Sequence, residues 1–252
     1  SNLQQLLELP ITIDVTDTRY GVPGIHVHEI SGSGGLEAGQ VVTATIDDDR
    51  RSAIRRNHTA THILHHALRE VLGEHVKQQG SYVGPDRLRF DFSHYEGLTP
   101  EQIAEIEDRV NAEVLDNGAC RHFETTMETA EQLGAIAFFG DKYCDVVRVL
   151  EAGRNSVELC GGTHVRALGD IGQFRIVSEG SIGSNIRRIE ALTGTASLEL
   201  AREAEQTVAQ AAEKLGIKNK NELLEIAESR MAEISSLRYE LAQTKQQIAV
   251  GQ

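Results

Sequence analysis

The sequence predicts an α+β protein in three parts, and three observations support this class. Short β-rich runs separated by glycine occupy residues 11–46. Between residues 52 and 195, amphipathic helical segments stand among strand-like runs without regular βαβ alternation. From Thr195 onward, proline is absent and alanine and glutamate dominate. We therefore expect a small barrel-like module over residues 1–51, a mixed core over 52–195 and a helical hairpin or coiled-coil arm over 196–252.

The composition fits a soluble globular chain. Its 252 residues are 40% hydrophobic and 25% charged, which allows a sizeable core. We find no leader of a secretory signal and no apolar run of about 18 residues, so we expect no membrane span. Three cysteines do not suggest a disulfide framework and favour the cytoplasm. A net charge of −13 argues against sequence-blind phosphate binding but leaves room for one local basic patch.

The first module is expected to be β-rich and incomplete. Turns are expected at residues 22–24 and 32–35, between strand-like runs at residues 11–15, 25–30 and 41–46. The second turn is rich in glycine but lacks the lysine and hydroxyl residue of a phosphate-binding loop. The module therefore carries no catalytic signature of its own.

A long helix is expected to begin near residues 49–52 and to end at Gly73. At roughly 100° per residue, one face of it gathers Ala60, Ile63, Leu64, Ala67 and Val71. The opposite face gathers His58, His62 and His65, with His66 nearby. A single histidine is usually a surface or core residue. Three on one face, away from the apolar stripe, favour a functional site.

The segments after this helix are predicted to form strands and helices that support the fold and carry no catalytic residues. Residues 88–92 alternate apolar and polar side chains, as a half-buried strand does. Thr99 and Gln102 form a capping box around Pro100, and Asn117 ends the helix that they start. A short helical piece is expected at residues 128–133. Further strands are expected at residues 146–150, 156–159, 174–177 and 186–192.

Two motifs about a hundred residues apart offer metal ligands. Residues at i and i+4 share one helix face, so His58 and His62 can both reach one cation. Cys160 and His164 enclose Gly-Gly-Thr after a strand, and the glycines allow a tight turn. Thiolate and imidazole together suit zinc. His62 and His66 have the same spacing, but the helical face favours His58 and His62 as the ligands.

The sequence of the tail predicts two helices, each with a stripe of apolar residues at heptad-like spacing, here called a seam. The first seam consists of Ala201, Ala204, Val208, Ala211 and Leu215. The second consists of Leu224, Ala227, Met231, Ile234, Leu241 and Ile248. A break over residues 216–221 separates them. The tail is interpreted as a linker or packing arm, with self-association through it as a further hypothesis.

Four longer stretches carry a family resemblance. They are Asn-His-Thr-Ala-Thr-His at residues 57–62, Arg-Phe-Asp-Phe at 89–92, Glu-Leu-Cys-Gly-Gly-Thr-His at 158–164 and Arg-Arg-Ile-Glu-Ala-Leu-Thr-Gly at 187–194. Over residues 11–195 the chain closely resembles the editing domain of the alanyl-tRNA synthetase family. The tail resembles the start of the helical arm in that family. Freestanding AlaX-type trans-editing proteins share the two metal motifs, and the second additional domain of threonyl-tRNA synthetase is more distantly similar.

The resemblance implies hydrolysis of the ester between serine or glycine and the 3′ end of alanine tRNA. A pocket that selects alanine by binding alone discriminates poorly against these two amino acids, so a second, hydrolytic site is needed. The implied zinc ligands are His58, His62, Cys160 and His164. Candidates for the group that recognises the serine hydroxyl are Thr59, Thr61, Gln78 and Thr163. The implied partners are the acceptor end of tRNA(Ala), with Arg55, Arg56, Arg187 and Arg188 as contact candidates, and the remainder of a synthetase chain, which would bind ATP.

The residues leave several readings open. Four protein ligands would close a zinc site, so one ligand is loose, or zinc expands its coordination, or zinc mainly anchors the substrate. No carboxylate stands out as the general base. Thr59 and Thr61 could instead bond to their own helix, Gln78 could lie on the surface, and the arginines could pair with acids.

The function also has alternatives. A freestanding trans-editing deacylase and a structural zinc module that binds tRNA without catalysis are the two main ones. A domain whose histidines bind nothing is the third. No ATP-dependent aminoacylation is expected from this chain, because the domains for alanine activation are absent from it.

Overall fold

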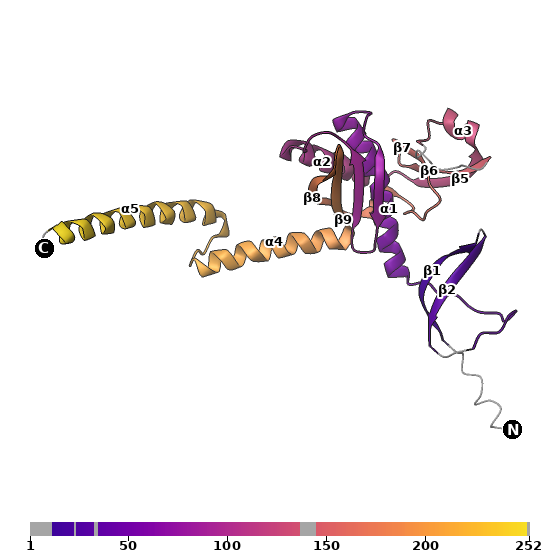
Figure 1. Cartoon of the computed structure of the whole chain (residues 1–252), viewed down its shortest axis with the longest axis horizontal. Helices are drawn as coiled ribbons and strands as arrows, with labels where there is room; N and C mark the ends of the chain where they lie inside the picture. Colours follow the sequence, from indigo (N-terminus) through magenta and orange to yellow (C-terminus); the bar gives the residue numbers. More distant parts are fainter. Residues whose placement is uncertain (1–11, 23, 33–34, 137–144, 251–252) are drawn as a thin grey trace, which may run out of the picture. The chain divides into compact units, whose positions relative to one another are not determined.

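The computed structural model describes residues 12–22, 24–32, 35–136 and 145–250 of the chain. The chain divides into two compact units, residues 1–46 and 47–252. Both helices and strands are present, so the mixed class predicted from the sequence is confirmed (Figure 1). The predicted three-part division remains a prediction. No described helix has both the length and the apolar character needed to cross a membrane.

The described residues of the first unit form an antiparallel hairpin. Strand β1 spans Asp14–Val22, strand β2 spans Ile25–Ser31, and Val15 pairs with Ile30. The expected strand at residues 41–46 is wrong, because those residues adopt no regular structure. Their β-branched side chains suit a strand, but a strand also needs a partner edge, and Val41 is 96% exposed. The described residues of this unit therefore form no closed barrel.

The second unit opens with α1, Asp48–Leu72. The side chain of Asp47 accepts a hydrogen bond from the Arg50 backbone N–H and caps the first turn. Gly73 ends the helix with a φ of 112°, a backbone conformation that favours glycine. The predicted start and end of this helix are confirmed. Its apolar stripe is buried as expected at Ala60, Ile63, Leu64 and Ala67, while Val71 is partly buried.

A four-stranded antiparallel sheet packs with α1 and with α2, Pro100–Asp116. Its order is β3 (Gln78–Val83), β4 (Leu88–Ser93), β9 (Ile186–Thr193) and β8 (Phe174–Gly183). Leu88, Phe90 and Phe92 alternate along β4 and are fully buried in the main core. The capping box of Thr99 and Gln102 on α2 is confirmed, as is the end of this helix at Asn117, which has a φ of 52°.

A smaller antiparallel sheet carries the cysteine motif. Its order is β5 (Cys120–Thr126), β6 (Val146–Ala152) and β7 (Ser156–Leu159), and α3 (Met127–Gln132) packs against it. After β7 the chain passes through the short helix η1, Leu168–Ile171, to β8. The predicted strands at residues 146–150, 156–159, 174–177 and 186–192 are confirmed, although β8 continues beyond residue 177.

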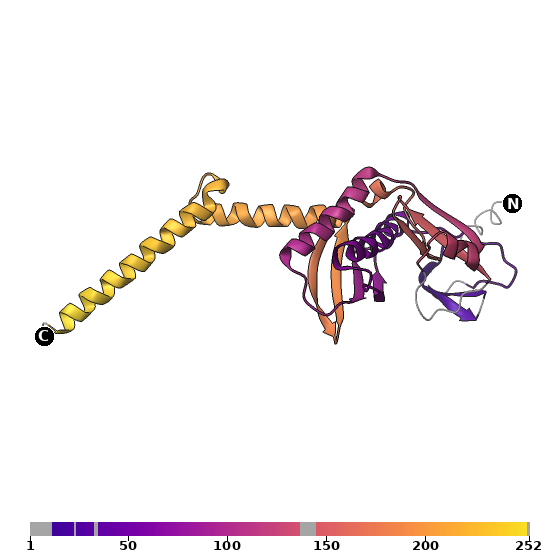
Figure 2. The ribbon, with the colours of Figure 1, turned by 90° about the horizontal axis from the view of Figure 1, so that it is seen from above.

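The tail is helical, as predicted. Helix α4 spans Gly194–Lys214 and follows β9 directly, and η2 (Lys220–Glu222) separates it from α5 (Leu223–Val250), as Figure 2 shows. Many seam residues are exposed, with Val208 at 41%, Met231 at 67% and Leu241 at 55%. Packing of the tail as a hairpin or coiled coil therefore stays a prediction.

Candidate metal centre

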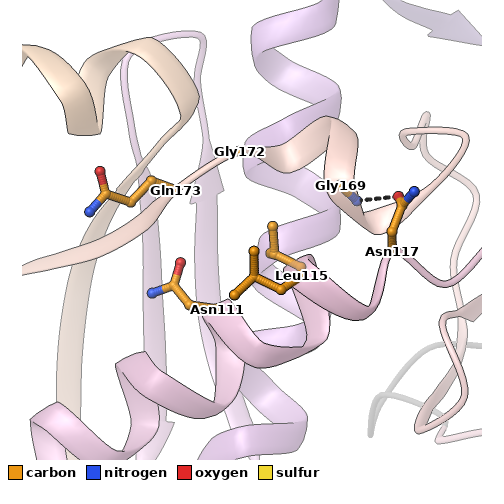
Figure 3. A pocket seen from close by; sticks show the side chains of 7 residues that line it. Asn111, Leu115, Asn117, Gly169, Gly172 and Gln173 are labelled. Carbon is orange, nitrogen blue, oxygen red and sulfur yellow. Dashed lines mark hydrogen bonds between the residues drawn. The ribbon is translucent and has the colours of Figure 1, made fainter.

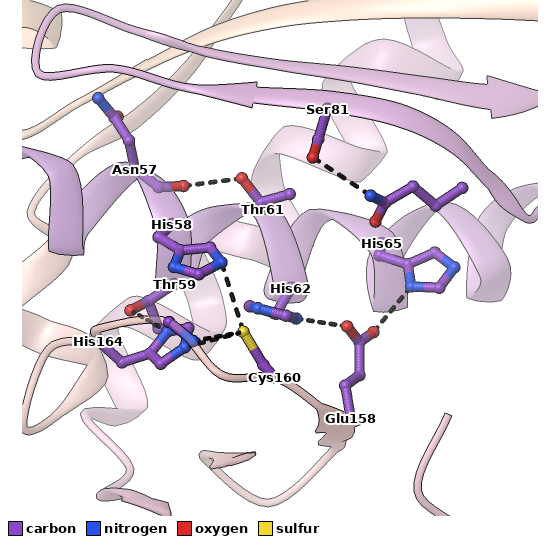
Figure 4. A network of polar contacts seen from close by, with 12 residues as sticks. Asn57, His58, Thr59, Thr61, His62, His65, Ser81, Glu158, Cys160 and His164 are labelled. Atoms are coloured by element: carbon purple, nitrogen blue, oxygen red, sulfur yellow. Dashed lines mark hydrogen bonds and ion pairs between the residues drawn. The ribbon is translucent and has the colours of Figure 1, made fainter. Parts of the chain in front are cut away.

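Two elements bring the predicted ligands together. Helix α1 presents His58 and His62 one turn apart, with 5.2 Å between their ring centroids. The loop after β7 brings Cys160 and His164 up to these rings (Figure 4). Gly162 makes the close approach sterically possible, because a Cβ atom at this position would lie 2.1 Å from Cε1 of His58. The glycine predicted to allow a tight turn thus also makes room for a ligand.

The four donor atoms lie close enough together to share one metal ion. All of them lie within 4.8 Å of one another. Cys160 Sγ is 3.5 Å from Nε2 of His58 and 3.3 Å from Nε2 of His164. Donors placed at bond length around a tetrahedral zinc ion would stand about 3.3–3.8 Å apart. The buried Nε2 of His62 has no hydrogen-bond partner among the described residues. The cluster could therefore hold a metal ion.

The protonation states of two ligands also favour a cation. Burial disfavours the charged thiolate of Cys160, but its contacts with the imidazoles of His164 and His58 outweigh burial and lower the pKa of Cys160 to about 3. Burial lowers the pKa of His164 to about 4, and the charges of His58 and His62 act in the same direction. At neutral pH these groups are a thiolate and a neutral imidazole, the forms that bind metals.

A buried carboxylate stands behind His62. Glu158 is 1% exposed, and one of its oxygens contacts Nδ1 of His62. The other oxygen lies 2.7 Å from Nδ1 of His65, which is 2% exposed. Although burial opposes both charges, the pair lowers the pKa of Glu158 and raises the pKa of His62. His66 takes no part in this contact; its Nε2 lies 3.7 Å from Glu70.

Thr59 lies beside the metal ligands, and its hydroxyl is fully used. It donates to the backbone oxygen of Arg55 at 2.8 Å and accepts from the backbone N–H of Val165 at 3.2 Å. Its third contact is with Nδ1 of His164, at 3.3 Å. A hydroxyl has one hydrogen and two lone pairs, so Nδ1 of His164 must be the donor. Thr59 is 0% exposed and holds the loop of His164 against the helix.

The other predicted pocket residues make fewer contacts. Thr61 is 4% exposed and donates to the backbone oxygen of Asn57 at 2.8 Å, which confirms the bond to its own helix. Gln78 is partly buried at the start of β3 and donates to Oγ of Ser81 at 3.2 Å. Thr163 is exposed and accepts a hydrogen bond from Arg51 at 3.4 Å. Each of these three side chains keeps an oxygen lone pair that can accept a further hydrogen bond.

The predicted tRNA contacts fall into two groups. Arg187 and Arg188 are each paired bidentately, the first with Glu179 at 2.6 and 2.7 Å and the second with Asp91 at 2.7 and 2.8 Å. Arg55 and Arg56 form no ion pair with any described residue. The alternative that the arginines pair with acids therefore holds for Arg187 and Arg188. Among the described residues, the arginines in the N-terminal half of α1 keep positive charge that no ion pair neutralises.

Two residues of the centre were missed from the sequence. Glu158 is one, and its position two residues before Cys160 on the β7 edge could have identified it, because alternate strand residues share a face. The other is Arg148 on β6, which donates to the backbone oxygens of Cys160 and Gly162. Its contact depends on the pairing of β6 with β7, which no local pattern reveals.

A separate cavity of about 550 Å³ lies near the C-terminal end of α2 (Figure 3). It is lined by Asn111, Val114, Leu115, Asn117, Gly169, Gly172 and Gln173. Asn111 bonds to the backbone of Glu107 and Phe174, and Asn117 accepts from the backbone N–H of Gly169. None of the lining residues is titratable, so this cavity does not compete with the metal centre as a catalytic site.

Comparison with known proteins finds similarity to part of the alanine–tRNA ligases. Residues 147–190 match the family described as the threonyl and alanyl tRNA synthetase second additional domain. The alanine–tRNA ligase of Xanthomonas campestris pv. campestris (strain 8004) is 45% identical over 249 residues, which are 98% of this chain and 28% of that protein. The alanine–tRNA ligase of Myxococcus xanthus (strain DK1622) is 49% identical over 202 residues, 80% of this chain and 22% of that protein. The chain thus spans less than a third of the length of these relatives.

Proposed function

This chain is homologous over almost its whole length to one region of the alanine–tRNA ligases, and we propose that it is an aminoacyl-tRNA deacylase. Its substrate is the ester of serine or glycine on the 3′ end of tRNA(Ala). The observation that carries the proposal is the convergence of two motifs, about a hundred residues apart, on one cluster of four donor atoms. The rest of a synthetase chain, with ATP-dependent aminoacylation, is the proposed context. This chain is expected not to aminoacylate by itself.

The proposed metal is zinc. Three imidazole nitrogens and one thiolate suit its preference for nitrogen and sulfur donors, and the donor atoms lie close enough together to share one ion. A zinc ion held by His58, His62, Cys160 and His164 would supply a Lewis acid beside the ester carbonyl. The chain itself holds the thiolate charged and His164 neutral, through the contacts described above.

The serine hydroxyl is proposed to meet Thr61, Gln78 or Thr163. Thr59 is less suited, because its hydroxyl has no hydrogen or lone pair left for a substrate. Thr61 donates its only hydrogen to Asn57 and can accept one from the substrate. An alanyl ester lacks the hydroxyl that would make this bond, so a site with a polar group here rejects it by leaving that group unpaired.

The acceptor end of the tRNA is proposed to approach along the N-terminal half of α1. Arg51 and Arg55 are i, i+4 neighbours, and Arg55 and His58 are i, i+3 neighbours, so their side chains share the face of the metal ligands. The first arginine already reaches Thr163 on the metal loop. These positive charges offset the net charge of −13 locally, where a phosphate must come close.

The alternative that the comparisons leave open is a structural zinc module without catalysis. Hydrolysis of serine-charged tRNA(Ala) by wild type and by C160A, with circular dichroism of both, separates the two. The deacylase proposal expects C160A to keep its fold and to lose most of its activity. An unfolded C160A variant together with an inactive, zinc-loaded wild type would favour the structural module. A C160S variant serves as a control of similar size.

A further inference from the structure

We infer that His58 is the exchangeable ligand of the metal centre. Each of the other three ligands is held in place by a further contact with a group that is not itself a metal ligand. The inference rests on the proposed zinc centre and resolves how a set of four protein ligands can serve a catalytic reaction. A closed tetrahedral set suits a structural zinc, whereas catalysis requires a position that the substrate can reach.

His62 is the ligand with the strongest second contact. Its Nδ1 faces the carboxylate of Glu158, so a metal ion that replaced the proton of Nε2 would leave the remaining proton on Nδ1, between the ring and that carboxylate. His65 binds the other oxygen of Glu158 and fixes that carboxylate from a neighbouring helix position. All three residues are at most 4% exposed. A carboxylate behind a metal-binding histidine sets the ring orientation and raises its basicity.

His164 and Cys160 are held by other groups. Thr59 accepts a hydrogen bond from Nδ1 of His164, which again directs Nε2 toward the cluster. The backbone N–H of Gly162 lies 3.4 Å from the sulfur of Cys160. Arg148 binds the backbone oxygens of Cys160 and Gly162 and so fixes the loop that carries the thiolate. Three of the four ligands therefore have a partner outside the metal centre.

His58 differs from the other two histidine ligands. Its Nδ1 makes no hydrogen bond to any residue that the structure describes, and the residue is only partly buried. Its ring rests against the bare Cα of Gly162 and beside the ring of His164, at 4.3 Å between centroids. It also belongs to the face of α1 that carries Arg51 and Arg55, from which the substrate is proposed to approach. Without a second partner, its ring can turn away and leave a coordination position open to the ester.

The test compares the zinc affinity of the full chain and of single variants, by competition with a chromophoric chelator. H58A should lower the affinity by no more than about tenfold, because three fixed ligands remain. H62A should lower it by a hundredfold or more. E158Q, which removes the charge behind His62, should lower it by about 10–100-fold. E70Q is the matched control, because Glu70 also meets a histidine of α1 but lies outside the cluster, and it should bind zinc as wild type does.

A second readout uses cobalt in place of zinc. Free imidazole added to cobalt-loaded H58A should enter the vacated position and restore the visible absorption spectrum of the wild type. The same addition should not restore H62A, whose position is buried. If H58A proves unfolded by circular dichroism, H58Q takes its place in both measurements. Loss of zinc from the His58 variants as complete as from H62A would overturn the inference. Failure of the wild type itself to bind zinc would instead overturn the metal centre of the proposed function.

Discussion

At the scale of single residues, the clustering of the four candidate ligands was predictable, but the groups that hold them in place were not. His58, His62, Cys160 and His164 stand in two short motifs, and the combination of these motifs predicts a shared cation. Glu158 is 96 residues from His62 and 93 from His65 in sequence, and only the packing of β7 against α1 brings them together. The spacing of the candidate ligands can be read from short sequence patterns. The contacts that hold these ligands in place depend on tertiary structure.

Gly162 gives the sharpest steric prediction. A methyl group there would meet the ring of His58 at 2.1 Å, so G162A should force the ring or the loop to move. We expect the free energy of unfolding, measured on the metal-free chain in the presence of a chelator, to fall by about 1–3 kcal/mol, the usual cost of overpacking. The neighbouring variant G161A is the control, because no atom lies within 4 Å of its added methyl. Urea unfolding measures both, and equal stabilities of the two variants would contradict the steric role of Gly162.

His94 provides a pH dependence away from the metal centre. It is 5% exposed, its Nδ1 lies 2.8 Å from Nε2 of His75, and burial followed by the charge of His75 lowers its pKa below the usual 6.5. The unfolded chain therefore binds a proton at His94 more readily, so this residue's contribution is complete above about pH 6.5 and is lost as the pH falls.

The variant H94F tests whether protonation of His94 lowers the stability of the folded chain as the pH falls. Between pH 7 and 5, the wild type should lose more free energy of unfolding than H94F does, since phenylalanine cannot take up the proton. Urea titrations at a series of pH values, in the presence of a chelator, give the difference between the two proteins. A difference that stays constant across this range would show that His94 is not titrating below its usual pKa.

At the scale of elements, local signals predicted helices better than strands. The ends of α1 and α2 were predicted from Asp49–Ser52, Gly73, Thr99 and Asn117, because capping involves residues within one turn. Strands β3 and β5 were missed. Both lie at the edge of a sheet and are largely polar, so neither shows a clear apolar alternation. Residues 41–46 illustrate the opposite error. Their composition favours a strand, but they have no partner strand and adopt no regular structure.

The capping box of α2 is open to a direct test. Thr99 accepts a hydrogen bond from the backbone N–H of Gln102 at 3.2 Å, and Gln102 reaches back to the backbone N–H of Thr99 at 2.9 Å. T99A should lower the free energy of unfolding by about 1 kcal/mol. T99S keeps the hydroxyl and should change it little. Equal destabilisation by both substitutions would place the contribution of Thr99 in its methyl group instead of its hydroxyl.

At the scale of the whole molecule, the pairing of distant strands could not be read from the sequence. Strand β4 lies between β3 and β9, and the β4–β9 pair joins residues about a hundred positions apart, such as Asp91 and Arg188. The mixed class followed from the order of segments, but the two separate sheets of the second unit did not. The candidate metal centre lies where α1, which contacts the larger sheet, meets β7 of the smaller one.

The distal part of α5 is expected to be dispensable for the metal centre. Its described residues beyond Arg230 are exposed throughout, and exposed positions contribute little to stability. A chain that lacks residues 231–252 should keep its zinc affinity and its free energy of unfolding within about 0.5 kcal/mol. Analytical ultracentrifugation of both chains tests the hypothesis of self-association, which predicts that any dimer of the full chain disappears on truncation. A truncated chain that no longer binds zinc would contradict the separation of arm and centre.

The most direct test of zinc-dependent editing is the hydrolysis of serine-charged tRNA(Ala) by the full chain before and after zinc removal. The full chain should contain about one zinc ion and should hydrolyse the seryl ester but not the alanyl ester. Its activity should be lost with a chelator and should recover when zinc is restored. A folded, zinc-loaded chain that leaves the seryl ester intact would contradict zinc-dependent editing, as would undiminished hydrolysis by a chain shown to contain no metal.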